Sequence, residues 1–165
     1  LECVKSFSKK EIEFLHKSFS KNLGVVESSS VGRLFDMVAS LDDLVHFQSY
    51  EGEAGLYSEW KMRQISSDKS FEFNIKDGEI SIKLDVFDAF LVPKFYNTLK
   101  NIVLHIAKQE KLPVLLSGGV WQNETLLSMV IKSFKKENII YYYNKTIPIN
   151  DSGISVGQIY KEVSR

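Results

Sequence analysis

Two adjacent glycines follow a short apolar run in the second half of the chain. Residues 113–116 read Pro-Val-Leu-Leu, and Ser117, Gly118 and Gly119 come directly after them. The apolar run predicts a short strand that is covered on both faces. The glycines allow backbone angles that other residues resist, and they let a ligand approach the main chain. The pattern therefore predicts a strand that ends in a possible ligand-binding turn.

A helical pattern begins directly after this turn, at Val120. Where a helix begins, unpaired backbone N–H groups and the positive end of the helix dipole face the space above the turn. This is the outline of a nucleotide or anion site, although an ordinary strand-to-helix connection has the same pattern. The expected apolar face of the helix contains Leu126, Leu127, Val130, Ile131 and Phe134.

Asp151 lies at a second junction of the same kind. Residues 139–143 predict another strand, and residues 147–158 then lead from a loop into a helix. An aspartate at a helix entrance is a common N-cap, which would by itself explain Asp151. Ligands of open α/β sheets bind beyond the carboxyl ends of the strands. We therefore expect both junctions to lie at one edge of a sheet.

Asp36 lies in a helix predicted for residues 31–41, on the side opposite the expected core face. Gly32, in the first turn of this helix, lowers the helix propensity. Close approach of a neighbouring segment or a ligand would compensate for it, but a solvated aspartate and a tolerated glycine are the alternative. The expected core face contains Leu34, Phe35, Val38 and Leu41.

The first half of the chain predicts further helices that would support these sites. Ser8 and Glu11 have the spacing of a capping box, and the helix that they begin is expected to end at Gly24. Glu51 and Glu53 lie in or near the first turn of a later helix, where the dipole favours acidic groups. The apolar stripe of the first helix contains Ile12, Leu15, Phe19 and Leu23, and the later helix is expected to pack through Leu56, Trp60 and Met62.

The middle of the chain predicts a hairpin and a long helix. Apolar and polar side chains alternate on both sides of Asp77-Gly78, which is a strong turn pair. Asp85 is expected to cap a short helical turn through Phe90, and Pro93 to open a long helix. Strands and helices in this order predict an α/β fold.

Charge and composition exclude several classes of protein. Of the 165 residues, 21 are Lys or Arg and 21 are Asp or Glu, so the net charge is zero and speaks against nucleic acid as a partner. No apolar run approaches the roughly 20 residues that span a bilayer. The single cysteine, Cys3, allows no internal disulfide and favours a reducing compartment, so we expect a cytoplasmic protein.

Four motifs in this order resemble the C-terminal end of the HypF-type carbamoyltransferases of [NiFe]-hydrogenase maturation. The same half-domain is similar to the TsaD family of tRNA threonylcarbamoyl transferases, although the wording of the first two motifs favours the hydrogenase branch. The motifs read SSVGRLFDMVA at residues 29–39, YEGEA at 50–54, LSGGVWQN at 116–123 and PINDSGISVGQ at 148–158.

The resemblance implies that residues 1–165 are the C-terminal portion of a TsaD-like carbamoyltransferase domain in a longer chain. They would form part of one lobe of an actin/sugar-kinase/Hsp70-type ATPase fold, helix-rich with a β-hairpin and strand–helix units. The glycine turn would surround the base and ribose of ATP, and Asp36 beside Gly32 would reach the ribose. The implied nucleotide-binding residues are Gly32, Asp36, Ser117, Gly118, Gly119 and Asn123.

The resemblance also implies a divalent metal, zinc or iron, that Asp151 holds together with two histidines outside this chain. Two positions depart from the family's usual wording: Ser152 stands where the family has Gly, and Tyr96 stands where it has His. Neither departure removes the proposed ligand. No catalytic nucleophile is assigned to this chain.

The complete enzyme would use carbamoyl phosphate and ATP, form a carbamoyl adenylate, and carbamoylate the C-terminal cysteine of a HypE-type acceptor protein. The carbamoyl group would become the cyanide ligand of the hydrogenase iron. The rest of its own chain would be the other partner, and this chain alone would be inactive. The alternatives are a relative that acts on another acceptor, such as tRNA or a small molecule, and a non-catalytic nucleotide-binding or scaffold module.

Overall fold

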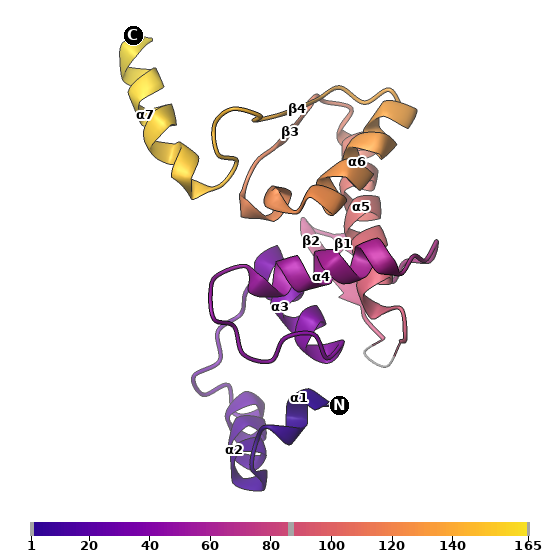
Figure 1. Ribbon diagram of the computed structural model, residues 1–165, viewed down its shortest axis with the longest axis vertical. Helices are drawn as coiled ribbons and strands as arrows, with labels where there is room; N and C mark the ends of the chain where they lie inside the picture. Colours follow the sequence, from indigo (N-terminus) through magenta and orange to yellow (C-terminus); the bar gives the residue numbers. More distant parts are fainter. Residues whose placement is uncertain (1, 86–87, 165) are drawn as a thin grey trace.

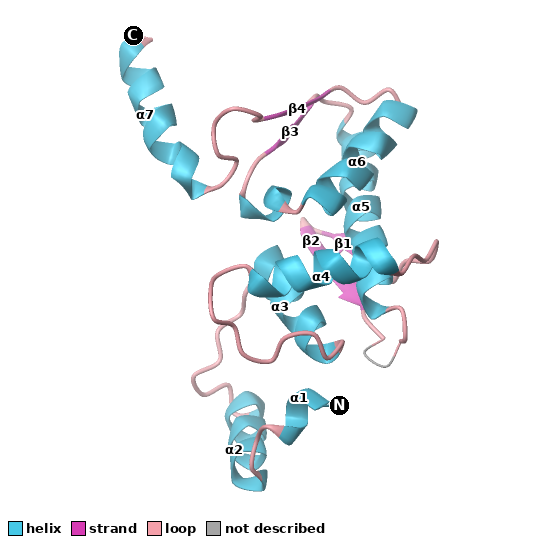
Figure 2. Cartoon of the chain, in the orientation of Figure 1, coloured by secondary structure: helices cyan, strands magenta, loops and turns pink. Residues whose placement is uncertain are grey.

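The computed structural model describes residues 2–85 and 88–164 (Figure 1). Helices dominate the chain, and short strands form two separate pairs (Figure 2). The elements are α1 (Glu2–Lys5), α2 (Lys9–Ser20), α3 (Val31–Leu41), α4 (Glu53–Gln64), β1 (Glu72–Lys76), β2 (Glu79–Lys83), α5 (Leu91–Glu110), β3 (Val114–Leu116), η1 (Gly119–Gln122), α6 (Glu124–Lys136), β4 (Tyr141–Tyr143), η2 (Asp151–Gly153) and α7 (Ile154–Val163).

The hydrophobic core surrounds α5, which lies against α3, α4 and α6. Phe35 of α3 meets the rings of Phe95 and Tyr96 edge-on, at centroid distances of 5.1 and 5.5 Å. Such pairs stabilise a core by roughly 0.5–1.5 kcal/mol beyond the burial of their apolar area. The helix begins at Leu91, two residues before the predicted Pro93, and the predicted turn from Asp85 to Phe90 includes residues outside the described part of the chain.

Strands β3 and β4 pair in parallel, with Val114 opposite Tyr141 and Leu116 opposite Tyr143. The connection between them passes through η1 and α6, so the predicted α/β architecture is confirmed. The prediction that both faces of β3 are covered is wrong, because Leu115 is 71% exposed. In the described residues this sheet has two strands, and α5 and α6 supply the core on the face of Leu116.

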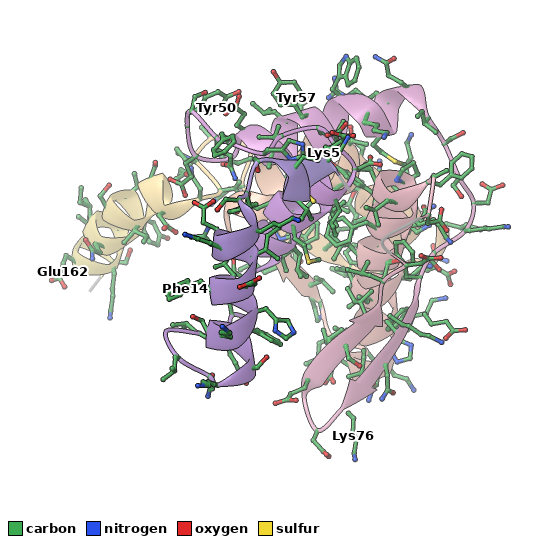
Figure 3. The ribbon with its side chains drawn as sticks, turned by 90° about the horizontal axis from the view of Figure 1, so that it is seen from below. Lys5, Phe14, Tyr50, Tyr57, Lys76 and Glu162 are labelled. Atoms are coloured by element: carbon green, nitrogen blue, oxygen red, sulfur yellow. The ribbon has the colours of Figure 1, made fainter. Side chains whose placement is uncertain are left out.

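The predicted hairpin is confirmed. β1 and β2 are antiparallel and turn at Asp77-Gly78, with Lys76 at the tip in Figure 3. The backbone N–H of Phe71, just before β1, donates to Oγ1 of Thr98 at 2.8 Å and fixes the hairpin to α5. His105 of α5 contacts the ring of Phe73 at a centroid distance of 6.0 Å, which gives this histidine a structural environment.

The first two helices lie at one end of the molecule (Figure 1). The capping box of Ser8 and Glu11 is confirmed, but α2 ends at Ser20 rather than at Gly24. The predicted apolar stripe of α2 is exposed in this structure, and Figure 3 shows the neighbouring Phe14 pointing outward. Within the described residues, no helix is both long and apolar enough to cross a membrane.

The predicted packing face of helix α4 is confirmed for Met62, which lies against the core, but it is wrong for Leu56 and Trp60. Leu56 and Trp60 are 56% and 57% exposed, whereas Ala54, Ser58 and Glu59 are buried. The small residues Ala54 and Ser58 are four positions apart and therefore share one side of the helix, where they permit close approach of a neighbouring helix.

Candidate functional site

The two junctions lie side by side, as predicted. The backbone N–H of Gly118 donates to the carbonyl oxygen of Ile149 at 2.8 Å. A Cβ added to Gly119 would lie 3.9 Å from Cβ of Asn150. The segment that contains Asp151 therefore lies against the glycine turn, beyond the carboxyl ends of the parallel strands β3 and β4.

Each glycine of the turn has a different reason to be there. Gly118 has φ of +105°, which side chains other than glycine rarely adopt, and a Cβ added to it would meet no atom within 4 Å. Gly119 has no positive φ, and its added Cβ would make only ordinary contacts, to Asn150 and to Oε1 of Gln122 at 3.9 Å. The backbone conformation requires Gly118, but nothing in this structure requires Gly119. Ser117 is exposed beside them.

The helix after the turn begins later than predicted. Residues Gly119–Gln122 form a 3-10 turn, and α6 begins at Glu124 with Asn123 as its N-cap. The carboxylate of Glu59 accepts the backbone N–H of Thr125 at 2.9 Å, so the protein itself occupies the positive end of α6. The prediction of free amides at the start of this helix is therefore wrong for Thr125 and Leu126 of α6. Among the described residues, the amides of Gly119 and Val120 have no hydrogen-bond partner and remain available.

Both polar atoms of the Asn123 carboxamide, Oδ1 and Nδ2, are hydrogen-bonded within the protein. Its Oδ1 accepts the backbone N–H of Leu126 at 2.9 Å, and its Nδ2 donates to the hydroxyl oxygen of Tyr96 at 2.5 Å. Burial raises the pKa of Tyr96, so this hydroxyl stays protonated. Asn123 therefore shapes the turn as an N-cap, and nucleotide contact by its side chain remains a prediction.

Sequence reasoning missed Glu59 and assigned Tyr96 no function. Glu59 has a side chain that is 9% exposed and pairs with Arg63 at 2.7 Å. Its Oε1 also accepts the hydroxyl of Thr125 at 2.8 Å. The spacing of Glu59 and Arg63, four residues apart on one helix, is a signal that the sequence does contain. Their contact with Thr125, which lies 66 residues after Glu59, has no local signal.

Asp36 and Gly32 lie on α3, which is a neighbour of η1. The prediction that Asp36 lies away from the core is confirmed, because its side chain is 31% exposed. Its Oδ1 accepts from Nε2 of Gln48 at 2.8 Å, and its Oδ2 pairs with Arg33 at 3.5 Å. Gly32 is exposed, and an added Cβ would make only one ordinary contact, to Oγ of Ser30.

Asp151 is exposed, and its carboxylate has no hydrogen-bond or ion-pair partner among the described residues. The alternative interpretation of Asp151 as an N-cap is wrong, because Asn150 accepts the backbone N–H of Ser152 at 3.3 Å instead. A free carboxylate suits a hard divalent cation, but one ligand does not complete a site. The described part of the chain contains no group of three His, Cys, Asp or Glu side chains that could hold a metal ion.

A surface hollow lies between α4 and the start of α6. Its wall combines exposed apolar side chains with charged groups, and it includes Gln122 at the end of the 3-10 turn. The hollow accounts for the exposure of Leu56 and Trp60, since these side chains line it. The lining residues are Leu56, Glu59, Trp60, Arg63, Gln122 and Glu124.

Residues 2–158 match the family model described as the second subdomain of the Kae1-like domain of the carbamoyltransferases. The chain belongs to the HypF carbamoyltransferase family. It is 28% identical over 150 residues to carbamoyltransferase HypF of Synechocystis, covering 82% of this chain and 20% of that protein. It is 24% identical over 169 residues to a probable HypF of Methanocaldococcus jannaschii, covering 92% of this chain and 22% of that protein.

A solved structure extends this similarity from sequence to fold. Full-length HypF, in a phosphate- and nucleotide-bound form, matches 94% of this chain with a TM-score of 0.80 and 28% identity. The match covers 28% of the HypF chain. The predicted resemblance and the partial ATPase-type lobe are therefore confirmed. The present chain spans about a fifth of the length of the curated HypF relatives that it matches.

Proposed function

We propose that this chain is the nucleotide-binding lobe of an enzyme that carbamoylates a protein thiol with carbamoyl phosphate and ATP. The observation that carries the proposal is the hydrogen bond from Gly118 to Ile149, which joins the glycine turn to the segment of Asp151. Nucleotide and metal would then meet at the edge beyond β3 and β4. The HypF structure that this chain matches was solved in a phosphate- and nucleotide-bound form, so nucleotide binding is known for that relative.

In the proposed reaction, water first cleaves carbamoyl phosphate into carbamate and phosphate. A carbamate oxygen then attacks the α-phosphorus of ATP, so that carbamoyl adenylate forms and pyrophosphate leaves. The sulfur of the C-terminal cysteine of a HypE-type acceptor then attacks the carbonyl carbon. A C–S bond forms, the C–O bond to AMP breaks, and AMP leaves. This chain contributes no nucleophile. Gly119 and Val120 would offer backbone donors, and Asp36 would accept from the ribose hydroxyls.

Asp151 would supply one carboxylate ligand to a zinc or iron ion, and histidines outside this chain would complete the site. Such an ion would neutralise negative charge on the phosphates. The free, exposed carboxylate fits this role, because no other described group competes for it.

Asp36→Ala is expected to weaken nucleotide binding with little change in stability. Hydrogen bonds to charged groups are worth about 1.5–3 kcal/mol, which corresponds to an increase in Kd of roughly 10- to 100-fold. Both partners of Asp36, Gln48 and Arg33, lie on the surface. The unfolding free energy should therefore fall by no more than about 0.5 kcal/mol. Isothermal titration of the full-length protein with ATP, beside a thermal melt, measures both quantities.

Asp43→Ala is the matched control, because it removes another exposed carboxylate just beyond the end of α3. It should leave the Kd for ATP unchanged. A lower melting temperature for Asp36→Ala with unchanged ATP affinity would mean that Asp36 is structural.

The 165-residue chain by itself is expected to show no carbamoyl phosphate-dependent cleavage of ATP. The reason is that a single carboxylate rarely holds a catalytic metal ion, and the described part of the chain contains no cluster of three His, Cys, Asp or Glu side chains that could hold one. Release of pyrophosphate, followed by an enzyme-coupled assay, tests this expectation. Robust ATP cleavage by the purified chain would contradict the proposal that residues outside this chain are needed to complete the active site.

A further inference from the structure

The glycine turn is connected to the rest of the fold through Asn123. This residue follows η1 directly and is the N-cap of α6. Its Nδ2 donates to the hydroxyl oxygen of Tyr96 on α5 at 2.5 Å and to the carbonyl oxygen of Gly55 on α4 at 3.5 Å. One carboxamide therefore joins α4, α5 and α6 at the point where the turn ends.

Tyr96 holds this carboxamide from within the core. Its ring is fully buried and meets Phe35 edge-on. Close packing leaves a buried ring few alternative positions. The hydroxyl oxygen therefore has a fixed place, and the hydrogen bond restricts the side chain of Asn123.

Glu59 of α4 binds Thr125, the second residue of α6. Its Oε1 accepts both the backbone N–H and the hydroxyl of Thr125, at 2.9 and 2.8 Å. Arg63 closes the ring of contacts, since Nη2 donates to Glu59 at 2.7 Å and Nε donates to Thr125 at 3.1 Å. Two consecutive backbone amides, of Thr125 and Leu126, are thus satisfied by side chains, the first from α4.

We propose that Tyr96 and Glu59 are positioning residues for the nucleotide site. By holding Asn123 and Thr125, they fix the start of α6 and thereby keep the amides of the glycine turn in place for the nucleotide. This inference rests on the function proposed above. Both residues act through α6, so neither has to contact the nucleotide.

Tyr96→Phe tests the proposal, because it keeps the ring and removes only the hydroxyl. In the full-length protein, we expect hydrogen exchange of the hydrogen-bonded amides of Trp121 and Asn123 to become about tenfold faster. The Kd for ATP should rise about 3- to 10-fold, as for the loss of one buried hydrogen bond. Thr98→Val is the matched control on the same helix. It also removes a buried hydroxyl, but one that binds Phe71 and Lys94 instead of the turn.

Thr98→Val should lower stability to a similar extent while leaving both the exchange of the Trp121 and Asn123 amides and the Kd for ATP unchanged. Glu59→Gln is the second variant, and it should loosen the same residues from α4. Equal effects of Tyr96→Phe and Thr98→Val, or no effect of Tyr96→Phe and Glu59→Gln, would overturn the proposal. Faster exchange in a protein that binds no ATP would refute the proposed function and leave the positioning role intact.

Discussion

Gly119→Val is expected to abolish nucleotide binding in a protein that still folds. The expected loss in affinity is at least about 100-fold, because a branched side chain would occupy the space in which the nucleotide approaches the backbone. The fold should tolerate the change, since Gly119 is exposed, has no positive φ and would make only ordinary contacts at 3.9 Å through an added Cβ. Titration of the full-length protein with ATP, together with its thermal melt, measures the two effects separately.

Gly119→Ala is the graded companion of this variant, and Gly118→Ala is the contrast. An alanine at 119 should bind ATP more weakly than wild type but more strongly than valine. At 118, the positive φ of +105° adds backbone strain of about 1–3 kcal/mol, so a loss of binding there would be explained by the altered turn. If the folded Gly119→Val variant bound ATP with wild-type affinity, the turn would be only a structural connection between β3 and α6.

Asp151→Asn in the full-length protein is expected to lose the metal and carbamoyl transfer, the latter by at least about 100-fold. A neutral amide is a poorer ligand than a carboxylate for a divalent ion. The unfolding free energy should change by no more than about 0.5 kcal/mol, because Asp151 is exposed and Asn150 provides the cap. Metal content, transfer rate and melting temperature of this variant are the measurements.

Asn150→Ala, one residue away, is expected to lower stability and to leave the metal in place, which is the opposite of the result expected for Asp151→Asn. It removes the side chain that accepts from Ser152, and a lost cap costs about 1 kcal/mol of stability. It should nevertheless retain its metal. Full metal occupancy and full transfer activity of Asp151→Asn would remove Asp151 from the metal site.

Local patterns in the sequence predicted the elements that depend on near neighbours. The capping box at Ser8 and the Asp77-Gly78 hairpin follow from residues close together in the chain. Gly118 was predictable for the same reason, because its positive φ demands glycine. The two junctions lie far apart in the chain, and their proximity followed from the general topology of α/β sheets.

Features that depend on distant segments were not predictable. The start of α6 is shifted to Glu124 by a 3-10 turn. The backbone N–H of Thr125 in its first turn is bound by Glu59, which comes from another helix. Leu115 is exposed because the described sheet has only two strands.

The prediction that Leu56 and Trp60 of α4 pack against the core was wrong for a related reason. Large apolar residues such as Trp60 suggested the core side, yet the small Ala54 and Ser58 are the buried ones. Similarly, Asn150 and Asp151 are both good N-cap residues, so sequence preference could not decide between them.

Carbamoyl transfer by the full-length protein tests the central claim most directly. Labelled carbamoyl phosphate would be incubated with the protein and a HypE-type acceptor ending in cysteine, with and without ATP. We predict label on the cysteine thiol only when ATP is present, with release of AMP and pyrophosphate, and no label with Gly119→Val. Transfer that needs no ATP, or full transfer by Gly119→Val, would contradict the assignment of this lobe as the nucleotide site.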